Sequence, residues 1–152
     1  MASSGCIVRR AGLHDIDALT LLFDGYRVFY EQEPDPDAAR EFIGERLRNE
    51  DSVILLAEDD DGRALGFTQL YPMFSSVRMR RIWILNDLFV ATYARRRGAA
   101  HALLKAAAEH ARRSGAAGLE LATAHDNHAA KSVYENLGWT LDTEFDHYSM
   151  NV

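Results

Sequence analysis

Residues 82–104 limit most strongly the fold and function that this chain can have. In them an apolar strand is followed by a short turn and then by the start of a helix. Three consecutive arginines and three small residues span the turn, as Arg95-Arg96-Arg97-Gly98-Ala99-Ala100. N–H groups in the first turn of a helix lack intrahelical partners, and the positive end of the helix dipole lies there. Gly98 has no Cβ, so a pyrophosphate could approach the main chain closely. The pattern predicts an anion site; a solvated arginine surface is the alternative.

Two common phosphate-binding motifs do not describe this stretch. It lacks the Gly-x-Gly-x-x-Gly fingerprint of dinucleotide-binding folds, and no early β-α-β unit precedes it. It also lacks the Gly-Lys-Ser/Thr of a Walker loop. The predicted anion site is therefore of another kind.

Hydrophobic periodicity predicts an alternation of strands and helices along the whole chain. Strands are expected at residues 6–10, 52–58, 64–71, 81–90 and 119–123, with one or two more in 139–150. Helices are expected at residues 15–30, 36–48, 98–114 and 127–137. The order β-α-α-β-β-β-α-β-α-β-β indicates one α/β domain with a mixed sheet, spanning residues 1–152.

Capping, proline and glycine residues support the predicted ends of these helices and strands. Asp35 before Pro36 predicts a helix N-cap followed by proline at the first helical position. The acidic run ending in Gly62 predicts a hairpin turn, and residues 72–79 are expected to form a loop.

The strand at 81–90 is apolar on both faces, which is typical of a central strand covered on both sides. Strict alternation places Ile82, Ile84 and Leu88 on one face, and Trp83, Leu85 and Phe89 on the other.

Composition limits the setting in which the protein works. One cysteine, Cys6, excludes an intramolecular disulfide framework and fits a reducing compartment. No apolar run approaches the roughly 20 residues of a membrane span, and the N-terminus lacks a signal-peptide core, so a cytoplasmic protein is expected. The net charge of −6 argues against nucleic acid as a general partner. The six histidines show no metal-ligand spacing; His125 and His128 are three apart but have no supporting ligand, so no metal is expected.

A second constellation follows the strand expected at 119–123. Asp126 or Asn127 could cap the short helix there, and Ala130 and Tyr134 lie on the same face of it. Taken alone, Tyr134 could equally be a core aromatic residue.

Together these motifs resemble the GNAT superfamily of acyl-CoA N-acyltransferases. The resemblance rests on Arg95-x-x-Gly98-x-Ala100 and on Asn127-x-x-Ala130-x-x-x-Tyr134-x-x-x-Gly138-Trp139. The run Leu85-Asn86-Asp87-Leu88-Phe89-Val90 is similar to the spermidine/spermine (diamine) acetyltransferase branch. The resemblance implies the GNAT fold with a splayed central strand pair, acetyl-CoA as acyl donor, and a homodimer.

The resemblance also implies roles for particular residues. The backbone of Leu88, Phe89 and Val90 would hold the acetyl group and pantetheine arm. The amides of Arg95, Arg96, Arg97, Gly98, Ala99 and Ala100 would hold the pyrophosphate. Asn127 and Ala130 would lie at the pantetheine or adenosine side. Tyr134 would donate a proton to the leaving thiolate, as a phenol with a pKa near ~10 can.

Two positions depart from the family pattern. Arg96 stands where many members carry glycine, so the loop must have negative φ there or bear strain. Asn86 stands where the polyamine enzymes carry a glutamate used with the acceptor amine. Asp87 is adjacent, but strand neighbours point to opposite faces, so only one of the two is expected to face the acceptor.

The acceptor is expected to be a primary amine of a small molecule, acetylated by direct transfer in a ternary complex. Glu31 and Glu33 follow the first helix and would attract a cationic amine. The base that deprotonates it remains open among Asp87, Asp126, His125, Glu33 through a water, and bulk water. A protein lysine or N-terminal acetyltransferase and a non-catalytic acyl-CoA sensor are the alternative functions.

Overall fold

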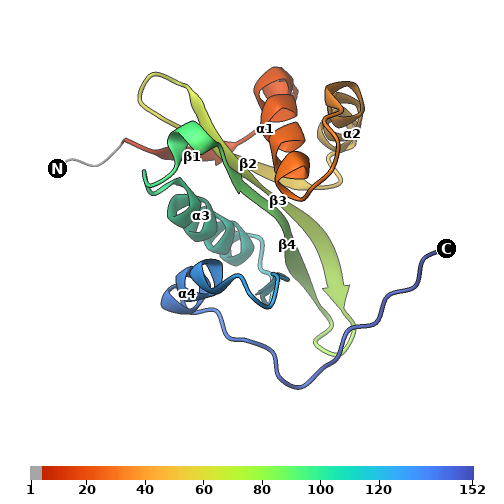
Figure 1. Ribbon diagram of the computed structural model, residues 1–152. Helices are drawn as coiled ribbons and strands as arrows, with labels where there is room; N and C mark the ends of the chain where they lie inside the picture. The colour runs from red at the N-terminus through yellow and green to blue at the C-terminus, as the bar shows by residue number, and fades with distance from the viewer. Residues whose placement is uncertain (1–4) are drawn as a thin grey trace. The chain divides into compact units, whose positions relative to one another are not determined.

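The computed structural model describes residues 5–152 (Figure 1), which divide into two compact units, residues 5–121 and Ala122–Val152. The first unit holds a five-stranded sheet in the order β1-β2-β3-β4-β5. Its strands are β1 (Ile7–Arg10), β2 (Val53–Glu58), β3 (Ala64–Ser75), β4 (Arg80–Val90) and β5 (Leu119–Glu120). Neighbouring strands are antiparallel except for β4 and β5, which are parallel. The expected mixed-sheet α/β fold is confirmed.

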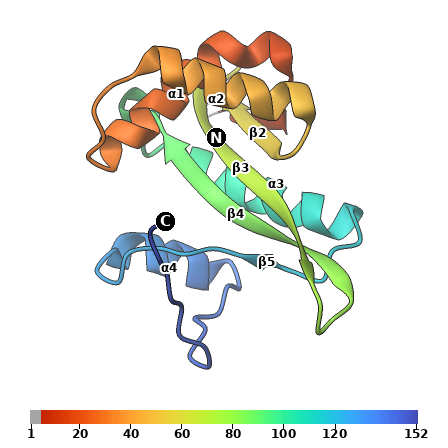
Figure 2. The same cartoon turned by 90° about the vertical axis from the view of Figure 1, so that its right-hand side faces the viewer.

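Helices cover both faces of this sheet. They are α1 (Ile16–Phe29), α2 (Pro36–Asn49) and α3 (Ala99–Arg113), with short 3₁₀ turns η1 (Leu13–Asp15) and η2 (Thr92–Ala94). Figures 1 and 2 show α1 and α2 over one face and α3 over the other. Leu19 and Ile43 are fully buried on the first side, and Leu103 on the second. Burying each such side chain stabilises the fold by about 1.5–3 kcal/mol.

The helix starts follow the predicted local chemistry. The side chain of Asp35 accepts a hydrogen bond from Ala38 N at 3.1 Å, and Pro36 is the first residue of α2. Gly98 is the N-cap of α3, in the left-handed conformation. Gly62 adopts positive φ in the predicted hairpin turn. Among residues 5–152, no helix has both the length and the apolar character needed to cross a bilayer.

The loop predicted at residues 72–79 is wrong for its first half. Strand β3 continues to Ser75, and Pro72 lies opposite Trp83 in the β3–β4 ladder. The pairing of β2 with β3 ends at Leu70, so Pro72 lies beyond β2 and its missing N–H interrupts no ladder there.

A β-bulge at Asn86 overturns the predicted faces of β4. Leu70 lies opposite Leu85 and Gln69 opposite Asp87, so Asn86 is an extra residue in the strand. Trp83 packs against His110 of α3, with ring centroids 4.9 Å apart. Phe89, predicted on the same face, packs instead against Tyr26 and Phe29 of α1. The extra residue exchanges the two faces, because side-chain alternation has a period of two.

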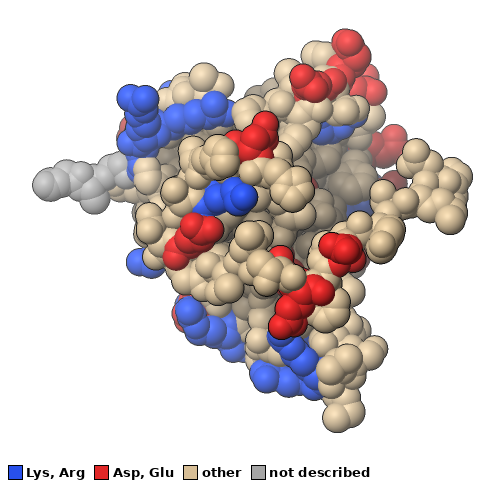
Figure 3. All heavy atoms as spheres, turned by 60° about the horizontal axis from the view of Figure 1, so that its bottom comes forward, with Lys and Arg blue, Asp and Glu red and all other residues tan. Residues whose placement is uncertain are grey.

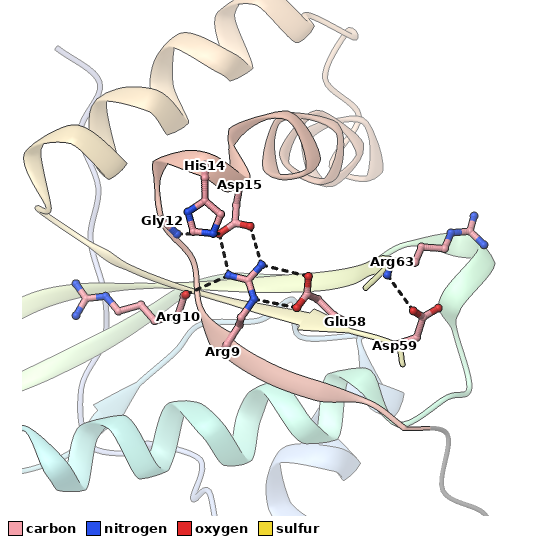
Figure 4. Close-up of polar contacts among 8 residues, drawn as sticks. All are labelled: Arg9, Arg10, Gly12, His14, Asp15, Glu58, Asp59 and Arg63. Atoms are coloured by element: carbon pink, nitrogen blue, oxygen red, sulfur yellow. Dashed lines mark hydrogen bonds and ion pairs between the residues drawn. The ribbon is translucent and has the colours of Figure 1, made fainter. Parts of the chain in front are cut away.

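An ion-pair cluster joins β1 to β2 and η1, at the edge of the sheet away from β4 (Figure 4). Two guanidinium nitrogens of Arg9 donate to Asp15 at 2.7 and 2.9 Å, and Arg9 Nε donates to Glu58 at 2.8 Å. Hydrogen bonds from Arg9 lower the pKa of Asp15, although burial opposes the shift. In Figure 4 the guanidinium of Arg9 lies between the two carboxylates.

The second unit contains helix α4 (His128–Asn136) and differs from prediction after it. The predicted helix is confirmed, and Gly138 follows it with positive φ. The strand expected at 119–123 is limited to Leu119–Glu120, and the one or two strands expected in 139–150 are not formed. A strand requires a hydrogen-bonding partner, and within these described residues the apolar side chains of Phe145 and Tyr148 are exposed.

Candidate active site

The end of β4 is paired on one side only. Strand β5 pairs with Trp83 and Ile84, whereas within residues 5–152 no strand pairs on that side with residues 85–90, the end of β4. On the other side Leu88, Phe89 and Val90 remain paired with β3. Among the described residues, this side of β4 beyond Ile84 therefore has no strand partner, which suits an extended ligand. The predicted splay of the central strand pair stays a prediction.

The turn after β4 is strained at Arg96, which is one of the two alternatives expected from the sequence. Arg96 has φ of 67°, so a non-glycine residue occupies the left-handed region. Such a conformation costs about 1–2 kcal/mol and is found at functional turns. Gly98, two residues later, has φ of 80° and begins α3.

The three arginines of this turn have different surroundings. Arg95 donates from Nε to the carbonyl oxygen of Val90 at 3.1 Å, and its guanidinium lies 5.8 Å from the ring centre of Phe89. Arg97 forms a long ion pair of 4.0 Å with Asp59 in the β2–β3 turn. Arg96 is exposed. The arginines therefore do not converge on one point, as three equivalent phosphate ligands would.

The start of α3 nevertheless fits a phosphate group. The N–H groups of Gly98, Ala99 and Ala100 lie in the first turn, where no intrahelical acceptor exists. A Cβ built on Gly98 would meet no atom within 4 Å, so the space over this turn is open. Open space, unpaired amides and the helix dipole together suit a diphosphate.

A buried carboxyl group lies near the end of β4, on the face of the sheet that α1 covers. Asp87 is only 3% exposed. Its Oδ2 accepts from Gln69 Nε2 at 2.5 Å, and its Oδ1 accepts from Asn86 Nδ2 at 2.8 Å. Burial raises the pKa of Asp87, although these hydrogen bonds favour the ionised form. The expectation that Asn86 and Asp87 point apart is wrong, because the bulge brings their side chains together.

Tyr26 of α1 borders the same carboxylate. Its hydroxyl donates to the main-chain oxygen of Asn86 at 3.3 Å and lies close enough to the carboxyl group of Asp87 to interact with it. Burial, reinforced by the nearby charge of Asp87, raises the pKa of Tyr26 above its usual range. The rings of Phe67 and Phe89 pack edge-on against it.

Sequence reasoning missed part of this cluster. Neither Tyr26 nor Gln69 is among the predicted site residues, nor is Ser52, whose Oγ donates to Gln69 Oε1 at 2.8 Å. The available signal was Gln69 itself, a polar residue within an otherwise apolar strand. Such a residue needs a buried hydrogen-bond partner.

Glu31 and Glu33 lie in the turn after α1, and both are exposed. Glu31 has φ of 64°. The guanidinium of Arg27 reaches only the main-chain oxygen of Glu33, at 3.3 Å. Attraction of a cation by these two carboxylates stays a prediction.

The second unit holds the remaining predicted site residues. Asn127, rather than Asp126, is the cap of α4, since its Oδ1 accepts from Ala130 N at 3.3 Å. The ring of Tyr134 lies 6.1 Å from that of Trp139.

His125 and Asp126 have only main-chain contacts to the helix that follows. The carbonyl of His125 accepts from Lys131 Nζ at 3.2 Å, and that of Asp126 accepts from His128 N at 2.9 Å. Over residues 5–152, no group of three His, Cys, Asp or Glu side chains is arranged to hold a metal ion.

Comparison with known proteins decides the family. Residues 16–139 match the model of the Acetyltransferase (GNAT) family. The chain belongs to the GNAT family of acetyltransferases. The matched range includes the end of β4, the start of α3 and all of α4.

Similar proteins agree with this assignment. The chain is 50% identical over 145 residues to the uncharacterized N-acetyltransferase YhfO of Bacillus subtilis. The matched region covers 95% of this chain and 97% of YhfO. A crystal structure of a probable acetyltransferase is 43% identical, with a TM-score of 0.91 over 96% of this chain and 97% of that chain. The protein is therefore an N-acetyltransferase.

A more distant structure shares the fold. It is a predicted acetyltransferase of Clostridium acetobutylicum crystallised with acetyl-CoA, 15% identical, with a TM-score of 0.74 over 95% of this chain and 96% of that chain. GNAT acetyltransferases use acetyl-CoA as their acyl donor.

Proposed function

We propose that this GNAT enzyme transfers an acetyl group from acetyl-CoA to a primary amine of a small molecule, directly within a ternary complex. One observation carries the proposal: the end of β4, which pairs with β3 on one side only, leads within ten residues to an open helix start at Gly98. An extended arm can lie along the first, and a diphosphate can bind at the second.

Acetyl-CoA supplies a thioester whose acyl carbon is open to attack by an amine. The main chain of Leu88, Phe89 and Val90 would bind and orient the acetyl and pantetheine portions. The amides of residues 95–100 would bind the diphosphate, with Gly98 at the centre of the turn. Asn127 and Ala130 are proposed to bind acetyl-CoA as well.

Tyr134 is proposed as the general acid. Its Oη carries a phenolic hydrogen and can act as a proton donor. Passing that proton to the departing sulfur prevents the build-up of negative charge there, a contribution typically worth about a hundredfold or more in rate.

The acceptor is proposed to be cationic in solution. Glu31 and Glu33 are exposed carboxylates after α1, and the buried carboxylate of Asp87 lies on the α1 face of the sheet. The face in Figure 3 carries separate groups of acidic and basic side chains. These features favour a small amine; a polyamine is one member of that class.

We also propose that the two compact units act as one acetyltransferase domain. The protein is proposed to work in the cytoplasm. It is also proposed to form a homodimer. Sedimentation equilibrium measures the oligomeric state. A mass equal to one chain of 17.1 kDa at micromolar concentration would reject the dimer.

The test of the function is thiol release from acetyl-CoA. The purified protein is incubated with alkylamines, diamines, polyamines, aromatic amines and lysine-containing or free N-terminal peptides, and the products are weighed by mass spectrometry. Acetylation of a small amine with saturable kinetics is expected. Turnover on peptides alone would reject the small-molecule proposal, and no thiol release with any amine would reject transfer to amines altogether.

A further inference from the structure

We propose that the hydrogen-bond chain from Ser52 through Gln69 to Asp87 holds the side-chain amide of Asn86 with its oxygen outward, and that this oxygen accepts an N–H of the acceptor amine. In this arrangement Asn86 touches the substrate, whereas Gln69 and Asp87 are positioning residues. The inference rests on the proposed function, since it names the acceptor side of that site.

The chain of hydrogen bonds crosses three adjacent strands. Ser52, the residue before β2, donates from Oγ to Gln69 Oε1 at 2.8 Å. Gln69, in β3, donates from Nε2 to Asp87 Oδ2 at 2.5 Å. Ser52, Gln69 and Asp87 are all buried. A polar chain in such a position persists only if its members satisfy one another, because an unpaired buried polar group costs about 1–3 kcal/mol.

The direction of each hydrogen bond fixes the next. An amide oxygen can only accept, so Ser52 must donate to Gln69. The amide nitrogen of Gln69 then faces Asp87, whose ionised carboxylate can only accept. The nitrogen of Asn86 donates to the other carboxylate oxygen at 2.8 Å, so the amide oxygen of Asn86 must face away from Asp87.

The bulge in β4 makes this contact possible. In a regular strand Asn86 and Asp87 would point to opposite faces, whereas the extra residue lets their side chains meet. Asn86 is exposed and lies two residues before Leu88, where the cofactor-binding part of β4 is proposed to begin. Over residues 5–152, no donor is hydrogen-bonded to Asn86 Oδ1.

Charge favours an ammonium or amine donor at this oxygen. Asp87 forms no ion pair with any of the described residues, so no neighbouring cation competes for its carboxyl oxygens. A carboxylate in a weakly polar interior polarises the amide bonded to it and makes the outer oxygen a stronger acceptor. An amine attacking an acyl carbon becomes positively charged at nitrogen, and Asn86 Oδ1 would stabilise its N–H groups during that step.

The kinetic test uses the amine that the panel identifies. Asn86→Ala is expected to raise its KM about tenfold or more, and Gln69→Leu several-fold, while the Kd of acetyl-CoA changes less than about twofold. The double variant should be little worse than Asn86→Ala, since Gln69 acts through Asn86. Additive effects, or equal losses in both substrates, would overturn the positioning role.

Two further variants separate positioning from stability. Ser52→Ala removes only the outermost hydrogen bond and keeps the test available if Gln69→Leu does not fold; a smaller rise in KM is expected. Glu58→Gln weakens the Arg9 cluster, two strands from β4, and should lower Tm with KM for the amine unchanged. A rise in KM with Glu58→Gln equal to that with Ser52→Ala would reject the specific role.

A measurement without substrate keeps this inference distinct from the proposed function. Two-dimensional ¹⁵N–¹H NMR follows the Nδ2 protons of Asn86, whose shifts should move in Asp87→Asn and in Ser52→Ala. Absence of acetylation by the wild-type protein would defeat the proposed function. Unchanged Asn86 shifts in Asp87→Asn would defeat the orientation of Asn86, whichever amine is acetylated.

Discussion

Gly66 approaches Phe89 so closely across the β3–β4 ladder that a Cβ on Gly66 would lie 2.5 Å from the main-chain oxygen of Phe89. The same atom would lie 3.1 Å from the Cα of Val90. Both contacts are to backbone, which cannot rotate away as a side chain can. The position of the proposed acetyl-binding end of β4 therefore depends on glycine at residue 66.

Replacing Gly66 with alanine should displace the end of β4. We expect Gly66→Ala to lower the free energy of unfolding by about 1–3 kcal/mol, as overpacking does, and to weaken acetyl-CoA binding. Gly12→Ala is the matched control, because its Cβ would meet only the movable side chain of His14. Urea denaturation and isothermal titration calorimetry measure the two effects. Unaltered acetyl-CoA affinity in folded Gly66→Ala would contradict the assignment of residues 88–90.

Features encoded by neighbouring residues were predictable from the sequence. Asp35 and Pro36 fix the start of α2 because a capping carboxylate and a proline suit adjacent positions of any helix. Gly98 marks the start of α3 for a related reason, since its φ is one that glycine adopts without strain. The strand, turn and helix of the proposed diphosphate site were therefore expected in the correct order.

Features set by distant residues were not predictable. The bulge at Asn86 depends on the register between β3 and β4, which alternation within β4 alone cannot reveal. The Asp87 cluster was missed for the same reason, because Gln69 comes from another strand. The final strands expected after Trp139 show the converse error: apolar residues were present, but a strand also needs a partner.

Gly98→Glu tests the proposed diphosphate site. We expect at least a hundredfold loss of acetyl-CoA affinity, because the side chain adds bulk and like charge at the helix start. The fold should survive, since a Cβ there meets no atom within 4 Å and the left-handed strain costs only about 1–2 kcal/mol. Gly98→Asn is the control, because asparagine tolerates positive φ and adds no charge. Full affinity in Gly98→Glu would place the diphosphate elsewhere.

Tyr134→Phe tests the general acid. The hydroxyl is lost while the ring, which lies 6.1 Å from that of Trp139, keeps its shape. We expect kcat to fall about a hundredfold and the Kd of acetyl-CoA to stay within about twofold. Steady-state kinetics and calorimetry measure these constants. Wild-type kcat would reject the proton-donating role.

Reversing the charges of Glu31 and Glu33 tests attraction of the acceptor. We expect the double lysine variant to raise KM for a cationic amine several-fold at low salt and less at high salt, because exposed charges are screened. Glu41→Lys with Glu45→Lys makes the same change of net charge on α2 and should have little effect. An equal rise in KM for both double variants would show that only net charge matters.

Asp15 links the stability of the fold to pH. Its hydrogen bonds from Arg9 lower its pKa in the folded protein, whereas an unfolded aspartate has a pKa near ~3.9. A lowered pKa gives stability that is present above the unfolded value and is lost as pH falls toward the folded one. Asp15→Asn should therefore cost about 1–3 kcal/mol at pH 7 and flatten the loss of stability below pH ~4. Asp17→Asn, which removes an exposed pair with Arg40, should change little. Urea denaturation between pH 3 and 7 measures the free energy of unfolding of the wild type and the two variants. If that free energy falls as steeply at acidic pH in Asp15→Asn as in the wild type, other carboxylates cause the pH dependence.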